Sequence, residues 1–266
     1  MRSEIYSILK KIKISKPLIH HITNWVSIYD CANITRCIGA LPVMAHAIEE
    51  SSDMTKISQA LVLNIGTPTS TLIKSMLSAG KKANELSIPV ILDVVGAGAT
   101  KFRTEKVKEI LRKIHIDVLK GNAGEIGVLA DKKAEVRGVE SISVEGDLTE
   151  IAQSLAEQYN TTVVITGKKD TISDSEKIYS VLNGHEMMGS IVGTGCMVAS
   201  VIGAFVSVEK DYCKASAFAL VCFGIAGELA SDGVKGPGSY KERFYDELYN
   251  LDENKIEKFK RLEVVR

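Results

Sequence analysis

The sequence is poor in cysteine, and its cysteines follow no pairing pattern. Five cysteines are scattered over 266 residues without C-x-x-C spacing. An odd, scattered set argues against a disulfide framework and a zinc site, and it fits a reducing cytosol. Low-complexity tracts, internal repeats and Pro/Gly/Ser-rich linkers are also missing. We therefore expect one domain spanning residues 1–266.

Charge imbalance and long apolar runs are missing as well. Lys plus Arg equals Asp plus Glu at 33 each, which argues against nucleic acid or an anionic membrane as a partner. The chain starts with an early acid, Glu4, and no long apolar stretch, so no signal peptide is expected. Residues 197–208 and 215–230 are apolar, but too short or too broken by glycine and Glu228 to span a membrane. A cytoplasmic protein with both stretches in buried helices is predicted.

Several catalytic motifs are absent. There is no Walker loop and no Gly-x-Ser-x-Gly elbow, which excludes a P-loop enzyme and disfavours a serine hydrolase. The Gly96-Ala97-Gly98 loop lacks the third glycine that a dinucleotide fingerprint requires.

Short apolar runs alternate with helix-like segments along the chain. The predicted strands are residues 60–65, 88–93, 116–119 and 162–165, and their β-branched content without strict alternation indicates burial on both faces. The predicted helices are residues 3–13, 24–38 with Thr23 as N-cap, 69–86, 104–113, 122–130 and 148–159. This rhythm predicts an α/β fold with a mostly parallel central sheet covered by helices.

Residues 176–191 interrupt that rhythm. Asn183-Gly184 lies between two apolar runs, 178–182 and 185–191, and Asn-Gly is a strong two-residue turn signal. A hairpin is therefore predicted there, followed by a largely helical last third from residue 194.

Polar residues just after the predicted strands are the candidates for a site, because ligands of open α/β sheets bind outside the carboxyl ends of the strands. Asp93 and Glu125 suit Mg²⁺ or its waters, although Asp93 and Asn122 could simply cap the next elements. Lys120 suits a nucleotide phosphate. The Thr166-Gly167 step suits a phosphate too, or only marks a strand end.

The segment Ile191-Val-Gly-Thr-Gly-Cys-Met197 precedes an apolar helix. Its two glycines and the positive helix end predict an anion hole formed by Gly193, Thr194, Gly195 and Cys196. The same helix end predicts a lowered pKa for Cys196. The alternative is a tight turn that only begins a buried helix.

Near the N-terminus, Asn24 could hydrogen-bond a ring nitrogen and Met44 could pack on a flat heterocycle. Structural roles are favoured for two further groups of residues: hydrogen-bonded histidines at 20, 21 and 46, and core cysteines at 31, 37, 213 and 222. The basic run 101–112 is predicted to be a solvated helix face.

From about residue 17 to 250 the chain resembles the hydroxyethylthiazole kinase family, a thiamine-pathway branch of the ribokinase-like superfamily. Nine segments carry the resemblance in order: residues 20–24, 42–47, 64–67, 95–100, 121–125, 183–185, 193–197, 223–228 and 236–239. The resemblance implies a three-layer α/β/α fold. It also implies Mg²⁺-dependent transfer of the ATP γ-phosphate to the hydroxyl of 4-methyl-5-(2-hydroxyethyl)thiazole.

By motif match, the resemblance also assigns roles to individual residues. Met44 and Gly193 would contact the thiazole, with Asn24 nearby. Lys120 and Thr166 would contact ATP. Asp93 and Glu125 would organise Mg²⁺, and Cys196 would be catalytic. Cys196 stands where most ribokinase-like enzymes have Asp, which favours a thiazole kinase over a pyrimidine kinase or a hydrate dehydratase. A non-catalytic sensor would not need this whole set. The resemblance further implies a cyclic homotrimer with thiazole sites between subunits.

The chain departs from the family pattern at three positions, where His21 replaces Asn, Val94 replaces Pro and Lys120 replaces Arg. These departures imply an altered substrate preference, a looser loop after Asp93 and a changed ATP affinity, respectively.

Overall fold

The computed structural model describes residues 3–132, 134–137, 140–144 and 146–266. Its main sheet contains β1 (Leu18–Ile22), β2 (Leu41–Val43), β3 (Ala60–Asn64), β4 (Val90–Asp93), β5 (Val118–Asn122), β8 (Thr162–Thr166), β9 (Asp170–Ser173), β10 (Ile178–Val181) and β11 (Leu262–Val264). Two further strands, β6 (Ala134–Arg137) and β7 (Glu140–Val144), pair separately.

The main sheet is mostly parallel, as predicted. Its strand order is β11-β10-β9-β8-β5-β4-β3-β1-β2, and every pair from β8 through β2 is parallel. The pairs from β8 to β11 are antiparallel. All five residues of β3 are buried, because helices cover both faces of a parallel sheet. The four predicted strands are confirmed, whereas β1, β2, β9 and β11 were not predicted. The runs of β1 and β2 contain polar residues and a proline, which are not typical of buried strands.

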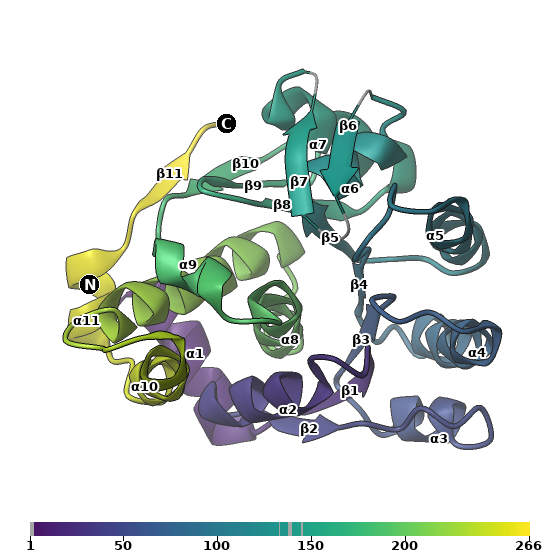
Figure 1. Ribbon diagram of the computed structural model, residues 1–266. Coiled ribbons are helices and arrows are strands. Elements are labelled where there is room, and N and C mark those ends of the chain that lie inside the picture. The colour runs from purple at the N-terminus through teal and green to yellow at the C-terminus, as the bar shows by residue number, and fades with distance from the viewer. Residues whose placement is uncertain (1–2, 133, 138–139, 145) are drawn as a thin grey trace.

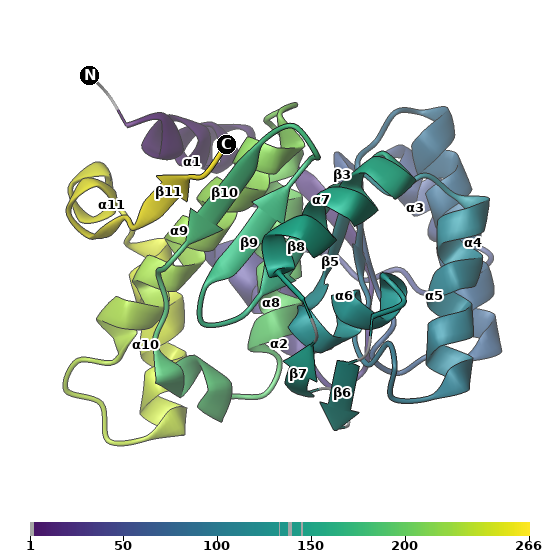
Figure 2. The ribbon, with the colours of Figure 1, turned by 90° about the horizontal axis from the view of Figure 1, so that it is seen from above.

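Helices cover both faces of the sheet, giving the predicted three-layer α/β/α architecture (Figure 1). One layer contains α3 (Ser51–Lys56), α4 (Ser70–Glu85), α5 (Lys101–Lys113), α6 (Ala123–Leu129) and α7 (Leu148–Tyr159). The other contains α1 (Glu4–Ser15), α2 (Ile28–Cys37), α8 (Thr194–Val206), α9 (Tyr212–Ala230), α10 (Pro237–Tyr249) and α11 (Glu253–Phe259). Figure 2 shows α1 and α11 next to each other, and the Ser3 N–H donates to Glu253 of α11 at 2.9 Å.

Helices α8 and α9 are the two buried helices predicted from the apolar stretches. Within the described part of the chain, α9 alone is long and apolar enough to cross a membrane, and 83% of its most apolar window is buried inside the protein. A helix that is apolar all round is expected in a core, and α9 packs there between α8 and α10.

Two local predictions are wrong. Thr23 does not cap α2, which begins at Ile28, because Asn24 Oδ1 accepts the N–H groups of Val26 and Ser27 at 3.0 Å and holds these residues in a turn. The hairpin does not turn at Asn183-Gly184. It joins β9 to β10, and the 3₁₀ helix η1 (Glu186–Ser190) stands where its second strand was expected.

Candidate active site

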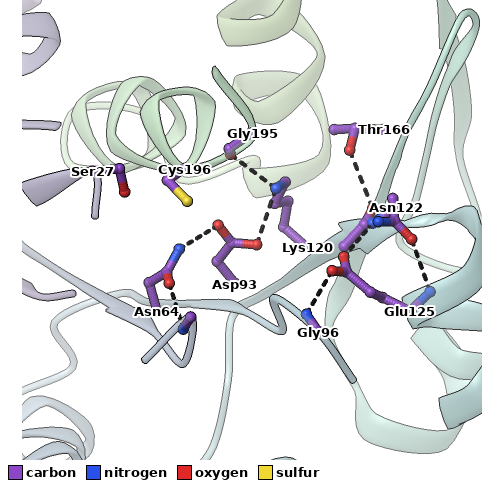
Figure 3. Close-up of polar contacts among 12 residues, drawn as sticks. Ser27, Asn64, Asp93, Gly96, Lys120, Asn122, Glu125, Thr166, Gly195 and Cys196 are labelled. Atoms are coloured by element: carbon purple, nitrogen blue, oxygen red, sulfur yellow. Dashed lines mark hydrogen bonds and ion pairs between the residues drawn. The ribbon is translucent and has the colours of Figure 1, made fainter. Parts of the chain in front are cut away.

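Polar side chains gather at the carboxyl ends of the neighbouring strands β3, β4, β5 and β8 (Figure 3). Asn64 ends β3, Asp93 ends β4, Lys120 lies in β5 and Thr166 ends β8. Asn24, just after β1, donates to Asn64 Oδ1 at 2.9 Å and joins the group. Parallel strands bring their carboxyl ends to one edge, so the expected clustering of Asp93, Lys120 and Thr166 is confirmed.

Asp93 is fully buried, and both its oxygens accept hydrogen bonds. Asn64 Nδ2 donates to Oδ2 at 2.6 Å, and Lys120 Nζ donates to Oδ1 at 3.0 Å. Burial raises the pKa of Asp93, against the opposing charge of Lys120. Burial would lower the pKa of Lys120, but Asp93 and Glu125 outweigh it and raise that pKa. Lys120 therefore stays charged inside the protein.

Lys120 joins the sheet to α8. Its Nζ also donates to the Gly195 carbonyl at 2.8 Å, so one ammonium connects Asp93 to the first turn of α8 (Figure 3). An ammonium has three donors, so a third remains for an incoming anion.

Glu125 begins α6 and belongs to a capping box with Asn122. Its Oε2 accepts the Asn122 N–H at 2.8 Å, while Asn122 Oδ1 accepts the Glu125 N–H at 2.9 Å. Its Oε1 accepts the Gly96 N–H at 2.7 Å. Burial raises the pKa of Glu125 to about 7, with Lys120 opposing and Asp93 adding to the rise. Asn122 is thus the N-cap of α6.

Asp93 and Glu125 fit a Mg²⁺ site that bound phosphates would complete. Two buried carboxylates face one buried ammonium, Lys120, so a further cation would be stabilised there. Each hydrogen-bonded carboxylate oxygen keeps a lone pair, and Mg²⁺ is commonly held by one or two carboxylates with phosphates and water. Over the described ranges no group of three or more His, Cys, Asp or Glu could hold a metal by itself.

Residues 193–196 open α8 with backbone N–H groups ahead of its hydrogen-bond ladder. Gly193 has φ +94°, a region that favours glycine, and an added Cβ would lie 2.8 Å from Ser27 Cβ. The first bond of the ladder runs from the Met197 N–H to the Gly193 carbonyl at 2.8 Å. The N–H groups of residues 194–196 therefore precede the ladder, at the positive helix end, and their geometry suits an anion.

The predicted lowering of the Cys196 pKa is wrong. Burial and the nearby Asp93 charge raise the pKa of this thiol, although Lys120 and hydrogen bonds from Ser27 and Asn64 oppose them. The positive end of α8 favours a lower pKa, but burial outweighs this effect because the sulfur lies among buried groups. Asn24 Nδ2 lies 3.3 Å from the sulfur.

The candidate substrate residues come from three elements. Asn24 Nδ2 also donates to Ser27 Oγ at 2.9 Å, so its amide is held by protein contacts. Met44 follows β2 at the same sheet edge, in a loop where its carbonyl lies 3.2 Å from His46 Nδ1. The His46 ring stacks on Trp25 with centroids 4.9 Å apart. Gly193 meets Ser27 from α8.

The histidines have structural contacts. His20 lies between Thr55 Oγ1 and the Ala45 carbonyl at 2.9 and 2.8 Å, and burial lowers its pKa to about 4. His21 Nδ1 lies 3.0 Å from the Ile19 carbonyl, and burial lowers its pKa to about 3.

Val94 forms a backbone hydrogen bond at the start of the loop after Asp93, and the looser loop stays a prediction. The Val94 N–H donates to the Lys120 carbonyl at 3.0 Å, a bond that proline cannot make.

The solvated-face prediction for residues 101–112 is wrong for Arg103. Its Nη1 donates to the Ile65 and Val95 carbonyls at 3.1 and 3.0 Å, and its Nη2 donates to the Gly66 carbonyl at 2.8 Å.

A cavity of about 560 Å³ lies beside the first turn of α8. Its lining residues are Thr166, Gly167, Lys168, Asp170, Asn183, Gly184, His185, Glu186, Met188, Gly189, Thr194, Gly195, Val198, Leu220, Phe223 and Gly224. Asp170 accepts the Gly167 N–H at 2.9 Å, and burial raises the pKa of Asp170 to about 7. Sequence reasoning missed Asp170 and the role of residues 183–189 here, because strand-end logic points only to parallel strands.

Comparisons with known proteins point to one family. Residues 9–254 match the model of the "Hydroxyethylthiazole kinase family". The hydroxyethylthiazole kinase of Methanosarcina acetivorans is 56% identical over 255 residues, which are 96% of this chain and 98% of that protein. The solved hydroxyethylthiazole kinase of Pyrococcus horikoshii has a TM-score of 0.90 and 43% identity, covering 98% of this chain and 99% of that one. A ribokinase-like superfamily protein from Enterococcus faecalis has a TM-score of 0.64 at 14% identity, covering 91% of this chain and 93% of that one, and shares the fold. The family match over nearly the whole chain places this protein in the hydroxyethylthiazole kinase family.

Proposed function

We propose that this kinase transfers the γ-phosphoryl group of ATP to the hydroxyl of 4-methyl-5-(2-hydroxyethyl)thiazole, giving the phosphate ester and ADP. One observation carries the proposal. The Lys120 ammonium contacts Asp93 and Gly195 beside a cavity of about 560 Å³ that is large enough for a nucleotide. Phosphoryl transfer depends on positioning and charge stabilisation, and this arrangement offers both.

Each part of the site has a place in that reaction. ATP would occupy the cavity, with its phosphates near Thr166 and the third donor of Lys120. The N–H groups of residues 194–196 would stabilise charge on the transferring group. Mg²⁺, held by Asp93 and Glu125, would supply charge neutralisation of the triphosphate.

The thiazole would lie against Asn24, Met44 and Gly193, with its hydroxyl near Cys196. The pKa of Cys196 is raised, so the thiol stays protonated at neutral pH and is a poor acceptor for the alcohol proton. In a loose transition state that proton leaves late, so Cys196 mainly orients the hydroxyl.

We also propose that the chain is a single domain, works in the cytoplasm and forms a homotrimer. Support for assembly comes from a group of exposed apolar side chains next to the substrate residues: Trp25, Val26, Tyr29 and Val192. Clustered exposed apolar residues are typical of interaction surfaces. A partner subunit on this surface would enclose the thiazole site. Sedimentation of the purified protein tests the assembly, and a monomer at micromolar concentration would contradict it.

The activity is tested by ADP release from ATP and Mg²⁺, with and without the thiazole alcohol. Hydroxymethylpyrimidine serves as a parallel sample, and mass spectrometry identifies the ester. Thiazole-dependent release with ester formation supports the proposal. Release only with the pyrimidine, or binding without turnover, contradicts it.

A further inference from the structure

One wall of the cavity is formed by residues 183–189, a segment outside the sheet. Strand β10 ends at Val181, and η1 begins at Glu186. Side-chain contacts from other elements therefore decide where this wall lies. The segment also carries Asn183-Gly184-His185, a motif with no assigned chemistry.

A single carboxylate on α9 holds the start of the wall. Glu228 Oε1 accepts the Gly184 N–H at 2.8 Å and Asn183 Nδ2 at 3.0 Å. Gly184 has φ +144°, so its N–H is directed by a backbone conformation that favours glycine. Glu228 also forms an ion pair with Arg261.

The chain leading into β11 is tied to the same wall. Asn183 Nδ2 donates to the Phe259 carbonyl at 2.8 Å, and the Arg261 N–H donates to Asn183 Oδ1 at 2.7 Å. Asn183, Glu228 and Arg261 thus form one network behind the cavity.

Two glycines let α9 approach the wall. A Cβ at Gly224 would lie 2.5 Å from Asn183 Cβ, and a Cβ at Gly227 would lie 2.5 Å from Met188 Sδ. Positions 224, 227 and 228 lie on one helix face, since residues three and four apart are neighbours. The motif Phe223-Gly-Ile-Ala-Gly-Glu228 therefore presents two close-contact points and one acceptor to the wall.

The far end of the wall is connected to the anion hole. Thr194 Oγ1 donates to the Met188 carbonyl at 2.9 Å. The segment is therefore fixed at one end by Glu228 and at the other by the first turn of α8, where phosphate would bind.

We propose that Glu228 is a positioning residue for nucleotide binding: through Asn183 and Gly184 it holds the wall of the ATP cavity in its binding conformation. The proposal rests on the proposed function, because the cavity is taken as the ATP site. Glu228 does not line the cavity, so its effect is indirect. Loss of its oxygen leaves the Gly184 N–H without its acceptor and the Asn183 amide with only the Phe259 carbonyl, and a partly buried donor without an acceptor favours another conformation.

The test compares Glu228→Met, Glu228→Gln and Glu247→Met. Glu247 on α10 is the matched control, since its side chain is 19% exposed against 20% for Glu228 and it also pairs with cations. The dissociation constant of ADP with Mg²⁺ is measured by calorimetry, together with KM for ATP, KM for the thiazole alcohol and Tm.

We expect Glu228→Met to weaken ADP binding by about tenfold or more, with KM for ATP raised and KM for the thiazole unchanged. Glu228→Gln keeps an acceptor oxygen, so it should recover most of the affinity. Glu247→Met should lower Tm without changing ADP binding. If Glu228→Met does not fold, Arg261→Met, at an exposed side chain, should weaken ADP binding by about twofold or more.

If Glu228→Met binds ADP as tightly as the wild type, the inference is overturned. Where Arg261→Met is measured in its place, wild-type ADP affinity in that variant overturns the inference. An equal loss of affinity in Glu247→Met also overturns it, because the effect would then follow stability alone. A wild-type protein that binds no ADP overturns the proposed function, and this inference with it.

Discussion

Replacing Lys120 by Met should strongly destabilise the protein, because it leaves the Asp93 carboxylate buried without its cation. The side chains of Lys120 and Asp93 are 4% and 0% exposed, with Nζ and Oδ1 3.0 Å apart. Breaking a buried ion pair by removing one partner costs about 3–5 kcal/mol. We expect a decrease of that size in the free energy of unfolding, measured by urea denaturation at pH 7.

The penalty should depend on pH. Burial raises the pKa of Asp93, and Lys120 opposes that rise, so the variant loses the opposing charge. A carboxyl whose folded-state pKa lies above its unfolded value contributes stability that is fully present below the unfolded pKa, about 3.9, and is lost as pH rises through the folded pKa. The deficit of Lys120→Met should therefore be smaller at pH 5 than at pH 8.

Two controls separate this effect from general damage. Lys106→Met removes an ion pair between partly exposed side chains, with Glu109 at 2.7 Å, and should change stability by less than about 1 kcal/mol. Adding Asp93→Asn to Lys120→Met removes the unpaired carboxylate and should restore at least about 1 kcal/mol. A Lys120→Met deficit below about 1 kcal/mol, or one that does not vary with pH, would refute the reasoning.

Three further substitutions, two of them with a control substitution, test other parts of the structure. Arg103→Met removes three hydrogen bonds to loop carbonyls and should lower the unfolding free energy by about 2 kcal/mol. Its control, Arg112→Met, lies on the exposed end of the same helix and should change the unfolding free energy by less than about 0.5 kcal/mol. Gly224→Ala forces a Cβ to 2.5 Å from a neighbouring atom and should cost about 1–3 kcal/mol in the same assay. Gly238→Ala in α10, with nothing within 4 Å of its Cβ, should stabilise by about 0.5 kcal/mol. Cys196→Asp should keep or raise kcat for the thiazole alcohol, measured by ADP release, because a carboxylate accepts a proton better than a protonated, half-buried thiol.

Different results would contradict each of these expectations. Equal losses for Arg103→Met and Arg112→Met would mean that the guanidinium contacts add nothing. A neutral Gly224→Ala would mean that α9 can move away from the wall without cost. An inactive, folded Cys196→Asp would show that the thiol has a role that a carboxylate cannot take.

Much of the fold could be predicted from residue patterns because the central strands are buried on both faces. Runs such as residues 60–65 are apolar throughout, and glycine or polar residues mark their ends. The candidate site followed from the same pattern, since residues after parallel strands must share an edge. Asp93, Lys120 and Thr166 were placed together by that rule alone.

Patterns failed where a distant contact outweighed a local preference. Asn183-Gly184 predicts a turn, but Asn183 is held by Glu228, Phe259 and Arg261. The helix end at Cys196 predicts a lowered pKa, but burial and Asp93 raise it. In both cases the deciding groups lie far away in the chain.

The sequence by itself thus determined the alternation of the central strands with helices, the sheet edge that carries the polar residues, and the glycine segment that opens α8. The tertiary structure alone decided which donors meet which acceptors. It brought Lys120 between Asp93 and Gly195, turned Arg103 toward the loops and placed Glu228 behind the cavity wall. Hydrogen bonds and ion pairs need atoms within about 3 Å, and only packing of the whole chain brings residues that lie far apart in sequence to that distance.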